Sequence, residues 1–407
     1  MLEPQSTTLF VLLLVLFAAL MAWLIWAKSL VLRILVAFLA FIPAAFFGVV
    51  LVNKYYGYYQ TWGSALADVT NLGGPAGGPP GTHLGSAQGV TRLLGHGVYL
   101  GIARQDGYTL RLDVHGQASH LTRQVYVYLP PQYFQPAYRT YRFPVVELIH
   151  GFPGQPQDWI SVLDITSTLR QLISRGLARP AVLVMPDANG ARGVSLQCLN
   201  QLHGPQDATF MAGDIPAYIA HRFRVWQPGR TWGIAGYSEG GFCAANLGLQ
   251  YGRSFGFAGV LSGYFQPTKN QLGHPERQVS PFGRDRILRL RNTPTHEVLH
   301  LPPGAPIPQF WIGAGTLDPA DARDAQIFRQ LLQLRQPTVV LRLVQGGHTM
   351  ATWRALVPPM LEWMTRKLAS NVLLAQARAR RVSHHGARPS PSASPGPRKR
   401  PTGRKRT

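Results

Sequence analysis

The 407-residue chain contains only two cysteines, Cys198 and Cys243. Structural zinc sites use four Cys or His ligands, and two cysteines at this spacing do not form one, so we expect no metal site and no cofactor. Acidic residues are also scarce. There are 18 Asp and Glu against 40 Lys and Arg, which gives a formal net charge of +22. No internal repeat is visible, which argues against a repeat architecture.

Two long apolar runs open the chain, at residues 8–27 and 30–52. Each is long enough to cross a hydrocarbon core of about 30 Å as a helix. A cleavable signal peptide is the alternative for the first run. However, that run is preceded by Glu3 rather than by basic residues, and a second run follows at once. We therefore expect two transmembrane helices within residues 1–54.

Charges around these runs predict their orientation. Lys28 and Arg33 lie at the short connection, and positively charged connections stay in the cytoplasm. Both termini would then lie outside, although Lys54 argues weakly for the reverse. An aromatic cluster follows between Tyr55 and Trp62. It fits either a belt at the membrane interface or the start of a packed helix.

Two segments have compositions that do not support a packed core. Residues 71–96 are rich in Gly and Pro, so the region 55–97 is predicted to contain a linker that lets the following domain move above the membrane. Residues 370–407 are predicted to form a disordered tail, with ten Lys or Arg and no acid in 371–407. Beside a membrane, anionic lipid or acidic cell-wall polymer is the expected partner of this tail rather than nucleic acid.

The most informative motif lies near the middle of the chain. Residues 232–236 read as an apolar strand, Gly236-Tyr237-Ser238-Glu239-Gly240 follows, and small residues then begin a helix. A Gly-x-Ser-x-Gly motif between a strand and a helix is typical of the nucleophile elbow of an α/β-hydrolase. The motif alone is weak evidence, and its flanking pattern makes it specific. We predict that Ser238 is a nucleophile.

In this fold the acid and the base follow the nucleophile in the chain. Asp318 follows one predicted strand, and His348 follows another at a Gly-Gly-His sequence. These positions are carboxyl ends of strands, where open α/β sheets place their sites. We predict His348 as the general base and Asp318 as the carboxylate that orients it. Asp321 and Asp324 are alternatives, but we expect them to begin the next helix.

An oxyanion hole is predicted from two backbone amides. The strand at 145–149 leads into His150-Gly151-Phe152-Pro153-Gly154, a His-Gly-x-x-Gly loop. In α/β-hydrolases one oxyanion amide comes from such a loop and the other from the residue after the nucleophile. We therefore predict the amides of Phe152 and Glu239, since Pro153 has no N–H. A simple strand-to-helix turn is the alternative for this loop.

The motifs lie within a repeating pattern of strands and helices. Strands are predicted at 108–114, 121–129, 145–149, 181–186, 231–236, 257–262, 308–313 and 338–344. Helical stretches between most of them predict an α/β-hydrolase domain at 98–369, with a mostly parallel sheet flanked by helices. The aperiodic segment 264–306 is predicted to be a lid-like insertion. Cys198 and Cys243 would meet at the carboxyl edge, as a disulfide or as two buried thiols.

Three of these motifs carry a resemblance to a known family. The 150–154 loop, the 236–241 elbow and the segment 346–354 (Gly-Gly-His-Thr-Met-Ala-Thr-Trp-Arg) resemble the esterase-D-like hydrolases. That group includes antigen-85 mycolyltransferases, enterochelin-type esterases and feruloyl esterases. The resemblance covers residues 100–368. It implies the same triad and oxyanion donors. Glu239 departs from the Met that the family often has after the nucleophile.

These observations predict a membrane-tethered serine esterase that acts on acyl esters outside the cytoplasm, in the cell membrane of a bacterium. Its reaction would pass through an acyl-Ser238 intermediate. An acyltransferase that moves the acyl group to an envelope sugar or lipid hydroxyl is the alternative, since the same triad serves both reactions. A non-catalytic envelope binding module is the third hypothesis.

Overall fold

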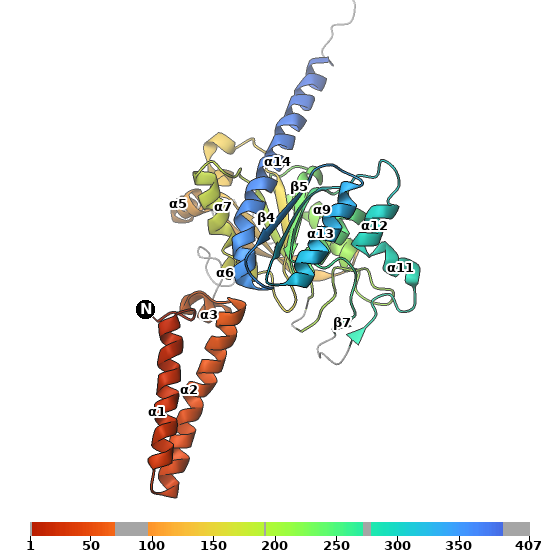
Figure 1. Cartoon of the computed structure of the whole chain (residues 1–407). Helices are drawn as coiled ribbons and strands as arrows, with labels where there is room; N and C mark the ends of the chain where they lie inside the picture. The colour runs from red at the N-terminus through yellow and green to blue at the C-terminus, as the bar shows by residue number, and fades with distance from the viewer. Residues whose placement is uncertain (1, 70–96, 191–192, 272–277, 386–407) are drawn as a thin grey trace, which may run out of the picture.

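The structure is a computed structural model, and it describes residues 2–69, 97–190, 193–271 and 278–385. A helical hairpin projects from one side of an α/β domain (Figure 1). The predicted Gly/Pro-rich linker at 71–96 and the end of the predicted tail, residues 386–407, lie outside the described residues.

The hairpin consists of α1 (Thr7–Trp26) and α2 (Leu30–Tyr56). Both helices are long and apolar enough to cross a membrane, by length and composition. They pack along each other, with the rings of Phe10 and Phe47 4.6 Å apart, while most of their large apolar side chains are exposed. Exposed apolar surface of this extent is unusual on a protein surrounded by water and is suited to a membrane or a partner.

The junction between hairpin and domain is fixed by direct contacts. Gly57 ends α2 in the left-handed conformation (φ 63°), and α3 (Trp62–Val69) follows. The guanidinium of Arg354 donates to the carbonyls of Gly57 and Tyr58, at 2.6 Å each. At this junction the hairpin therefore contacts the domain directly, ahead of the predicted linker. Part of the predicted aromatic belt, Tyr58, is also packed against the domain core.

The domain is built on one eight-stranded sheet in the order β1-β2-β4-β3-β5-β6-β9-β10. β1 and β2 pair antiparallel, β2 and β4 pair antiparallel, and all other neighbours are parallel. This confirms the predicted mostly parallel sheet. The strands are β1 (Tyr108–His115), β2 (Thr122–Leu129), β3 (Val145–Ile149), β4 (Val182–Pro186), β5 (Gly229–Tyr237), β6 (Phe255–Leu261), β9 (Gln309–Gly315) and β10 (Val339–Val344).

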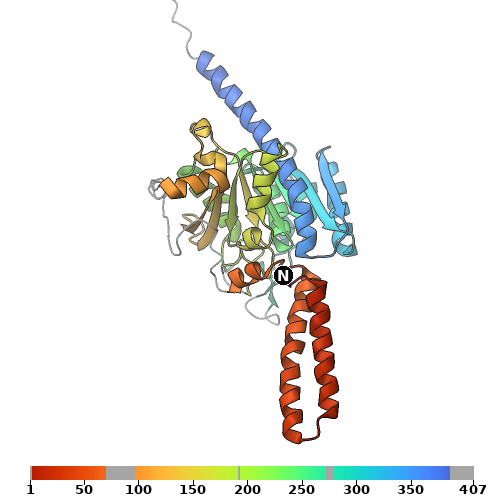
Figure 2. The same cartoon turned by 90° about the vertical axis from the view of Figure 1, so that its left-hand side faces the viewer.

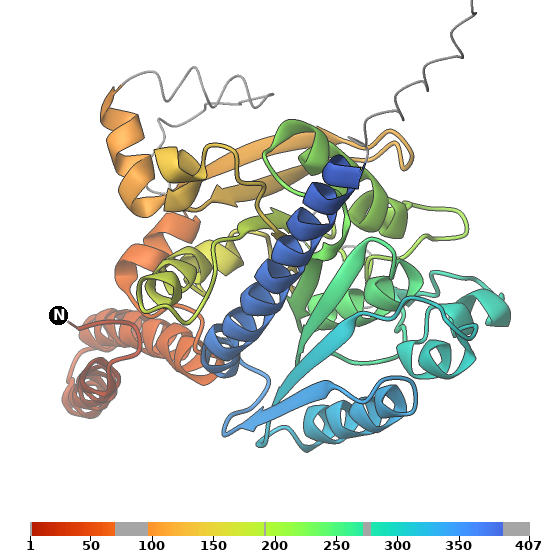
Figure 3. The ribbon, with the colours of Figure 1, turned by 90° about the horizontal axis from the view of Figure 1, so that it is seen from above.

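Helices cover both faces of the sheet and bury the central strands on both sides. The sequences of these strands are therefore nearly continuous apolar runs. Along β3, Val145 and Ile149 join one core cluster, whereas Val146 and Leu148 join the other. α14 (Met350–His385) lies across the second face (Figure 3). The other helices are α5 (Gly97–Asp106), η1 (Pro131–Phe134), η2 (Pro136–Tyr138), α6 (Asp158–Ser161), α7 (Ile165–Ser174), α8 (Asp207–Thr209), the π-helical η3 (Phe210–Asp214), α9 (Ile215–Arg222), α10 (Glu239–Gln250), α12 (Pro294–His300) and α13 (Pro319–Gln333).

One predicted boundary is corrected by the structure. α14 continues to His385, so the tail does not begin at residue 370; the stretch after that position is rich in Ala, Leu, Gln and Arg, which favour helix.

The segment 264–306, predicted as a lid-like insertion, has some regular structure of its own. It contains a small ribbon of β7 (Asn270–Gln271) and β8 (Gln278–Val279), then α11 (Arg286–Arg291) and α12, and it buries Phe282 and Val298 completely.

The core contains a buried carboxyl group, Glu147, that should make stability depend on pH. Glu147 is fully buried in β3 between Val184 and Ile234, and neither of its carboxyl oxygens has a hydrogen-bond partner among the described residues. Burial raises the pKa of Glu147 well above its ordinary value. The folded state therefore binds a proton that the unfolded chain releases, and stability falls as pH rises above the unfolded pKa.

We expect Glu147→Gln, which mimics the protonated acid, to match the wild type at pH 5 in thermal unfolding. At pH 8 it should be more stable than the wild type, because only the wild type carries a buried carboxyl whose proton the unfolded chain releases. Glu362→Gln, at a partly exposed position on α14, is the control and should show no such difference. Identical pH profiles for wild type and Glu147→Gln would contradict the assignment.

Candidate active site

Ser238 occupies the sharp turn between β5 and α10. It has φ 55° and ψ −120°, a conformation that non-glycine residues rarely adopt. Its amide donates to the carbonyl of Leu261 on β6 at 2.9 Å, which holds the turn in place. A Cβ at Gly236 would overlap the backbone of Gly240, and one at Gly240 would overlap the carbonyl of Ile149. Both motif glycines are therefore required for this turn.

His348 lies in the turn after β10 and reaches the serine. Its Nε2 is 2.8 Å from Ser238 Oγ. The ring edge packs against Trp353, with centroids 5.1 Å apart, and the side chain remains 38% exposed. The structure thus brings together the two predicted residues, which are 110 positions apart in the chain. This contact is the geometry expected of a nucleophile and its general base.

The carboxylate that contacts His348 is Asp321, not the predicted Asp318. Asp321 Oδ2 lies 2.6 Å from His348 Nδ1, whereas Asp318 Oδ2 lies 3.8 Å away. Asp318 instead caps α13, where its Oδ1 accepts the amide of Asp321 at 3.1 Å. The sequence pattern of a strand followed by Asp predicted the correct loop, but the Asp that it indicated is the N-cap of α13. The residue three positions later directs its side chain back to the histidine.

The predicted oxyanion loop passes directly against the nucleophile. A Cβ at Gly151 would lie 2.8 Å from the Tyr237 ring and 3.1 Å from Ser238 Cβ. Glu239 is the first residue of α10, so the helix leaves its amide unused, and the helix dipole favours negative charge there. The placements of the 150–154 loop and the α10 terminus are consistent with the two predicted oxyanion amides.

His150 anchors this loop. Its ring is fully buried, with Nδ1 2.8 Å from the carbonyl of Gly151 and Nε2 3.0 Å from the amide of Ala188. Since the amide of Ala188 can only donate, Nε2 accepts, and the proton is assigned to Nδ1. The ring thereby joins the 150–154 loop to the loop that follows β4.

The Glu239 side chain points away from the substrate side and into a buried polar cluster. Its Oε2 lies 2.5 Å from Ser195 Oγ, and burial raises the pKa of the Glu239 carboxyl. Nearby, Gln197 accepts the amide of Thr268 at 2.8 Å. A disulfide joins Cys198, in the same loop, to Cys243 on α10. The loop is thus attached to the nucleophile helix and to the 264–306 insertion.

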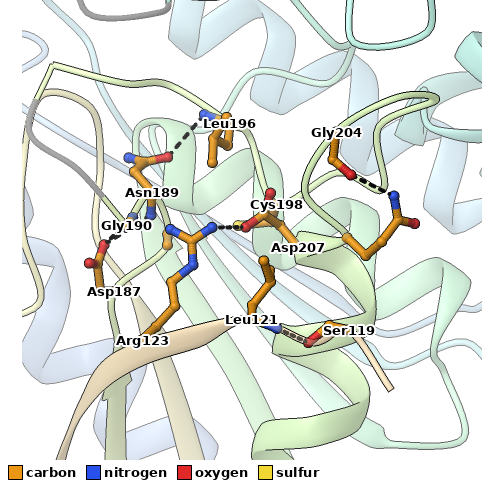
Figure 4. A network of polar contacts seen from close by, with 12 residues as sticks. Ser119, Leu121, Arg123, Asp187, Asn189, Gly190, Leu196, Cys198, Gly204 and Asp207 are labelled. Atoms are coloured by element: carbon orange, nitrogen blue, oxygen red, sulfur yellow. Dashed lines mark hydrogen bonds and ion pairs between the residues drawn. The ribbon is translucent and has the colours of Figure 1, made fainter. Parts of the chain in front are cut away.

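A buried ion pair supports the same loop from below, as Figure 4 shows. Arg123 of β2 donates to Asp207 Oδ1 at 2.6 Å, and both side chains are almost fully buried. The Arg123 guanidinium also fills the space beside Gly190, where any Cβ would overlap it. Gly190 itself has φ 73° and donates to Asp187 Oδ1 at 2.8 Å. These contacts fix the path of the chain leading to Ser195 and Cys198.

A second group that sequence reasoning missed lies behind the nucleophile. Asp158, at the start of α6, is buried, and its Oδ2 accepts the Tyr237 hydroxyl at 3.1 Å and the Tyr58 hydroxyl at 2.9 Å. Tyr237 immediately precedes Ser238. The Tyr58 contact spans 100 residues and has no local signature, so no sequence pattern predicts it.

Asp318, Asp321 and His348 are also close enough together to offer three ligand atoms to a metal ion. Each ring nitrogen of His348 already has a partner, Asp321 at Nδ1 and Ser238 at Nε2. This arrangement matches the geometry of a Ser-His-Asp triad.

Comparisons with known proteins agree with this geometry. A family model described as "Putative esterase" matches residues 117–364. An uncharacterised protein of Corynebacterium glutamicum is 27% identical over 253 residues, which is 60% of this chain and 57% of that protein. The chain therefore spans little more than half the length of this curated relative.

Solved structures show the fold. A ferulic acid esterase matches with a TM-score of 0.54 and 19% identity, over 65% of this chain and 99% of that one. A fluorophosphonate-binding serine hydrolase of Staphylococcus aureus matches with a TM-score of 0.51 and 18% identity, over 64% and 98%. The predicted α/β-hydrolase fold is confirmed.

The choice between the two carboxylates can be tested directly. We expect Asp321→Asn to lower kcat for a short-chain p-nitrophenyl ester by about 10²–10⁴-fold, because the amide cannot stabilise the protonated imidazole. Asp318→Asn should keep activity within about tenfold, since Asn is also a good helix cap. A larger loss in Asp318→Asn than in Asp321→Asn would contradict the assignment.

The disulfide generates a stability prediction. It closes a loop with a sequence separation of 45 residues, for which chain entropy gives a stabilisation of about 4 kcal/mol. Reduction should therefore lower the denaturant midpoint of the wild type. The variant Cys198→Ala/Cys243→Ala should unfold at a similarly low midpoint and be insensitive to reductant. A wild type unaffected by complete reduction, verified by thiol titration, would contradict this role.

Proposed function

The chain belongs to the esterase family whose model matches residues 117–364, and we propose that it is a membrane-tethered serine esterase acting outside the cytoplasm. One observation carries the catalytic part of this proposal. Ser238 Oγ, the two ring nitrogens of His348 and Asp321 Oδ2 form a continuous chain of contacts of 2.8 and 2.6 Å. Such a chain activates a hydroxyl for attack on an ester.

The first half-reaction acylates the serine. Ser238 Oγ attacks the acyl carbonyl while His348 Nε2 takes its proton, and Asp321 stabilises the imidazolium that forms. The amides of Phe152 and Glu239 bind the negative oxygen of the tetrahedral intermediate. When the intermediate collapses, the ester C–O bond breaks and His348 returns the proton to the leaving alcohol. The acyl group remains on Ser238.

The second half-reaction removes the acyl group. Water, deprotonated by His348, attacks the acyl carbonyl, and the carboxylic acid leaves as Ser238 recovers its proton. The neutral tautomer of His348 between its two partners suits both steps, because the same nitrogen accepts and then donates. Esterase activity follows when water is the acceptor.

Membrane tethering is supported by the hairpin. α1 and α2 satisfy the length and hydropathy requirements of spanning helices and leave most of their apolar side chains exposed. Because α1 begins and α2 ends beside the domain while their connecting turn lies at the far end (Figure 2), a spanning hairpin would put Lys28 and Arg33 across the membrane from the active site. The positive-inside rule then assigns that turn to the cytoplasm. The Cys198–Cys243 disulfide supports an oxidising location for the domain.

An acyltransferase is the second candidate. The resemblance to mycolyltransferases favours it, and His348 is sufficiently exposed that a sugar or lipid hydroxyl could replace water in the second half-reaction. The relative from Corynebacterium glutamicum supports a bacterium as the source of the protein. The basic tail would bind anionic lipid or cell-wall polymer through charge rather than sequence.

The test compares full-length wild type with Ser238→Ala in detergent, on a series of p-nitrophenyl acyl esters. We expect the alanine variant to lose about 10⁴–10⁶-fold in kcat, because the nucleophile acts as one unit with its base. Ser174→Ala, at an exposed serine on α7, should keep full activity.

Sugar and lipid alcohols added to the same assay separate the candidates. Free acid formed at an unchanged rate supports the esterase, whereas acyl-sugar or acyl-lipid product formed in preference to acid supports the transferase. Turnover that does not depend on Ser238 would contradict both, and absence of turnover would favour a non-catalytic binding module.

A further inference from the structure

The membrane hairpin joins the domain at the catalytic end of the sheet. A Cβ at Gly57, the residue that caps the end of α2, would lie 3.1 Å from Cβ of Ala351, three residues after His348. Arg354, in the same turn of α14, donates to the carbonyls of Gly57 and Tyr58 and to that of Val162. The hairpin is thus attached to α14, the helix that begins two residues after His348.

The same junction reaches the nucleophile. Tyr58 and Tyr237 donate to one carboxylate oxygen of Asp158, so the residue after the hairpin and the residue before Ser238 share an acceptor. The chain start is also tied in, since the amide of Trp62 donates to Glu3 at 3.0 Å. Contacts on both sides of Gly57 therefore fix the direction in which the active site faces.

The active site faces the plane at which the hairpin would enter a membrane. The catalytic serine and histidine follow the carboxyl ends of β5 and β10, and Figures 1 and 2 show α1 and α2 projecting from this edge. The ribbon of β7 and β8, which follows β6, lies on the same side. The α11 segment comes next in the chain.

The surface of this segment is both basic and apolar. Ile287 and Leu290, three residues apart on α11, are 66% and 42% exposed. The stretch 284–291 carries four arginines and one aspartate. Leu317, beside the catalytic carboxylates, is 68% exposed. Apolar side chains flanked by arginines are the composition of surfaces that bind anionic lipid interfaces.

We propose that the carboxyl edge of the sheet rests on the membrane, with α11 as its lipid-contacting element, and that the substrate is an acyl ester embedded in an anionic bilayer. This inference rests on the proposed tethering and esterase activity. The fixed junction holds Ser238 at the interface. Arg286 of α11 and Arg284 just before it bind the lipid headgroups. Ile287 and Leu290 of α11 enter the acyl region. The ester then reaches Ser238 without leaving the bilayer.

The experiment uses full-length protein in vesicles of phosphatidylglycerol and phosphatidylcholine. Two esters with the same fluorogenic leaving group are compared: a water-soluble butyrate of 4-methylumbelliferone and its bilayer-embedded palmitate. Arg284→Glu/Arg286→Glu should lower palmitate turnover by about tenfold or more, because each cation near an anionic surface contributes about 1 kcal/mol. Butyrate turnover should not change, and the loss should disappear in pure phosphatidylcholine.

Matched controls separate charge from position. Arg139→Glu/Arg175→Glu changes the same charge at exposed residues that precede β3 and β4, at the opposite edge of the sheet, and should leave both esters unaffected. Ile287→Ser/Leu290→Ser should lower palmitate turnover in both lipid compositions. Equal palmitate turnover by wild type and both α11 variants, with butyrate hydrolysis intact, would overturn the inference.

The same experiments show separately whether the proposed esterase activity or the proposed membrane tethering is wrong. If butyrate hydrolysis does not depend on Ser238, the esterase assignment is wrong. If the protein does not float with vesicles after alkaline extraction, the tethering is wrong. The α11 inference is overturned on its own only when both of these controls succeed and the α11 variants still match the wild type.

Discussion

The close approach of α10 to the sheet is the constraint on which the rest of the site depends. Gly236 and Gly240 allow backbone to meet backbone at the end of β5, and this places Ser238 in a strained conformation with its hydroxyl free of the helix. The same approach sets the first amide of α10 beside the oxyanion loop. The surrounding structure holds the strain in place: the Ser238 amide donates to Leu261 of β6, buried Glu239 attaches the first turn of α10 to Ser195, and the disulfide holds α10 at Cys243.

Local patterns predicted the sheet and two triad residues, because strand periodicity and the Gly-x-Ser-x-Gly and Gly-Gly-His motifs are short-range signals. The β3 bounds agree to the residue, and the other strands agree within two. The acid was predicted incorrectly, since Asp318 and Asp321 have the same chemistry and only the path of α13 decides which reaches His348. Asp158 and Tyr58 were not predicted, because their contacts depend on tertiary packing between segments about 80 to 100 residues apart. The end of α14 was misplaced because a basic composition outweighed the helix propensity of its residues.

Two sets of contacts give the molecule its organisation. Behind the nucleophile, Asp158 connects Tyr237 to the end of the hairpin, and Arg354 connects the hairpin to the helix that follows His348. On the other side, Arg123, Asp207 and the disulfide hold the 187–200 loop, which in turn contacts the 264–306 insertion through Gln197. Ser238 therefore lies between contacts that attach the hairpin and contacts that attach the 264–306 insertion.

The central claim is that Ser238 is a nucleophile activated by His348. Its most direct test is labelling of the full-length protein with a fluorophosphonate, followed by peptide mass spectrometry. We expect one adduct, on Ser238, that forms much more slowly in His348→Ala and not at all in denatured protein. Labelling of another residue, or labelling of Ser238 at the same rate without His348, would contradict it.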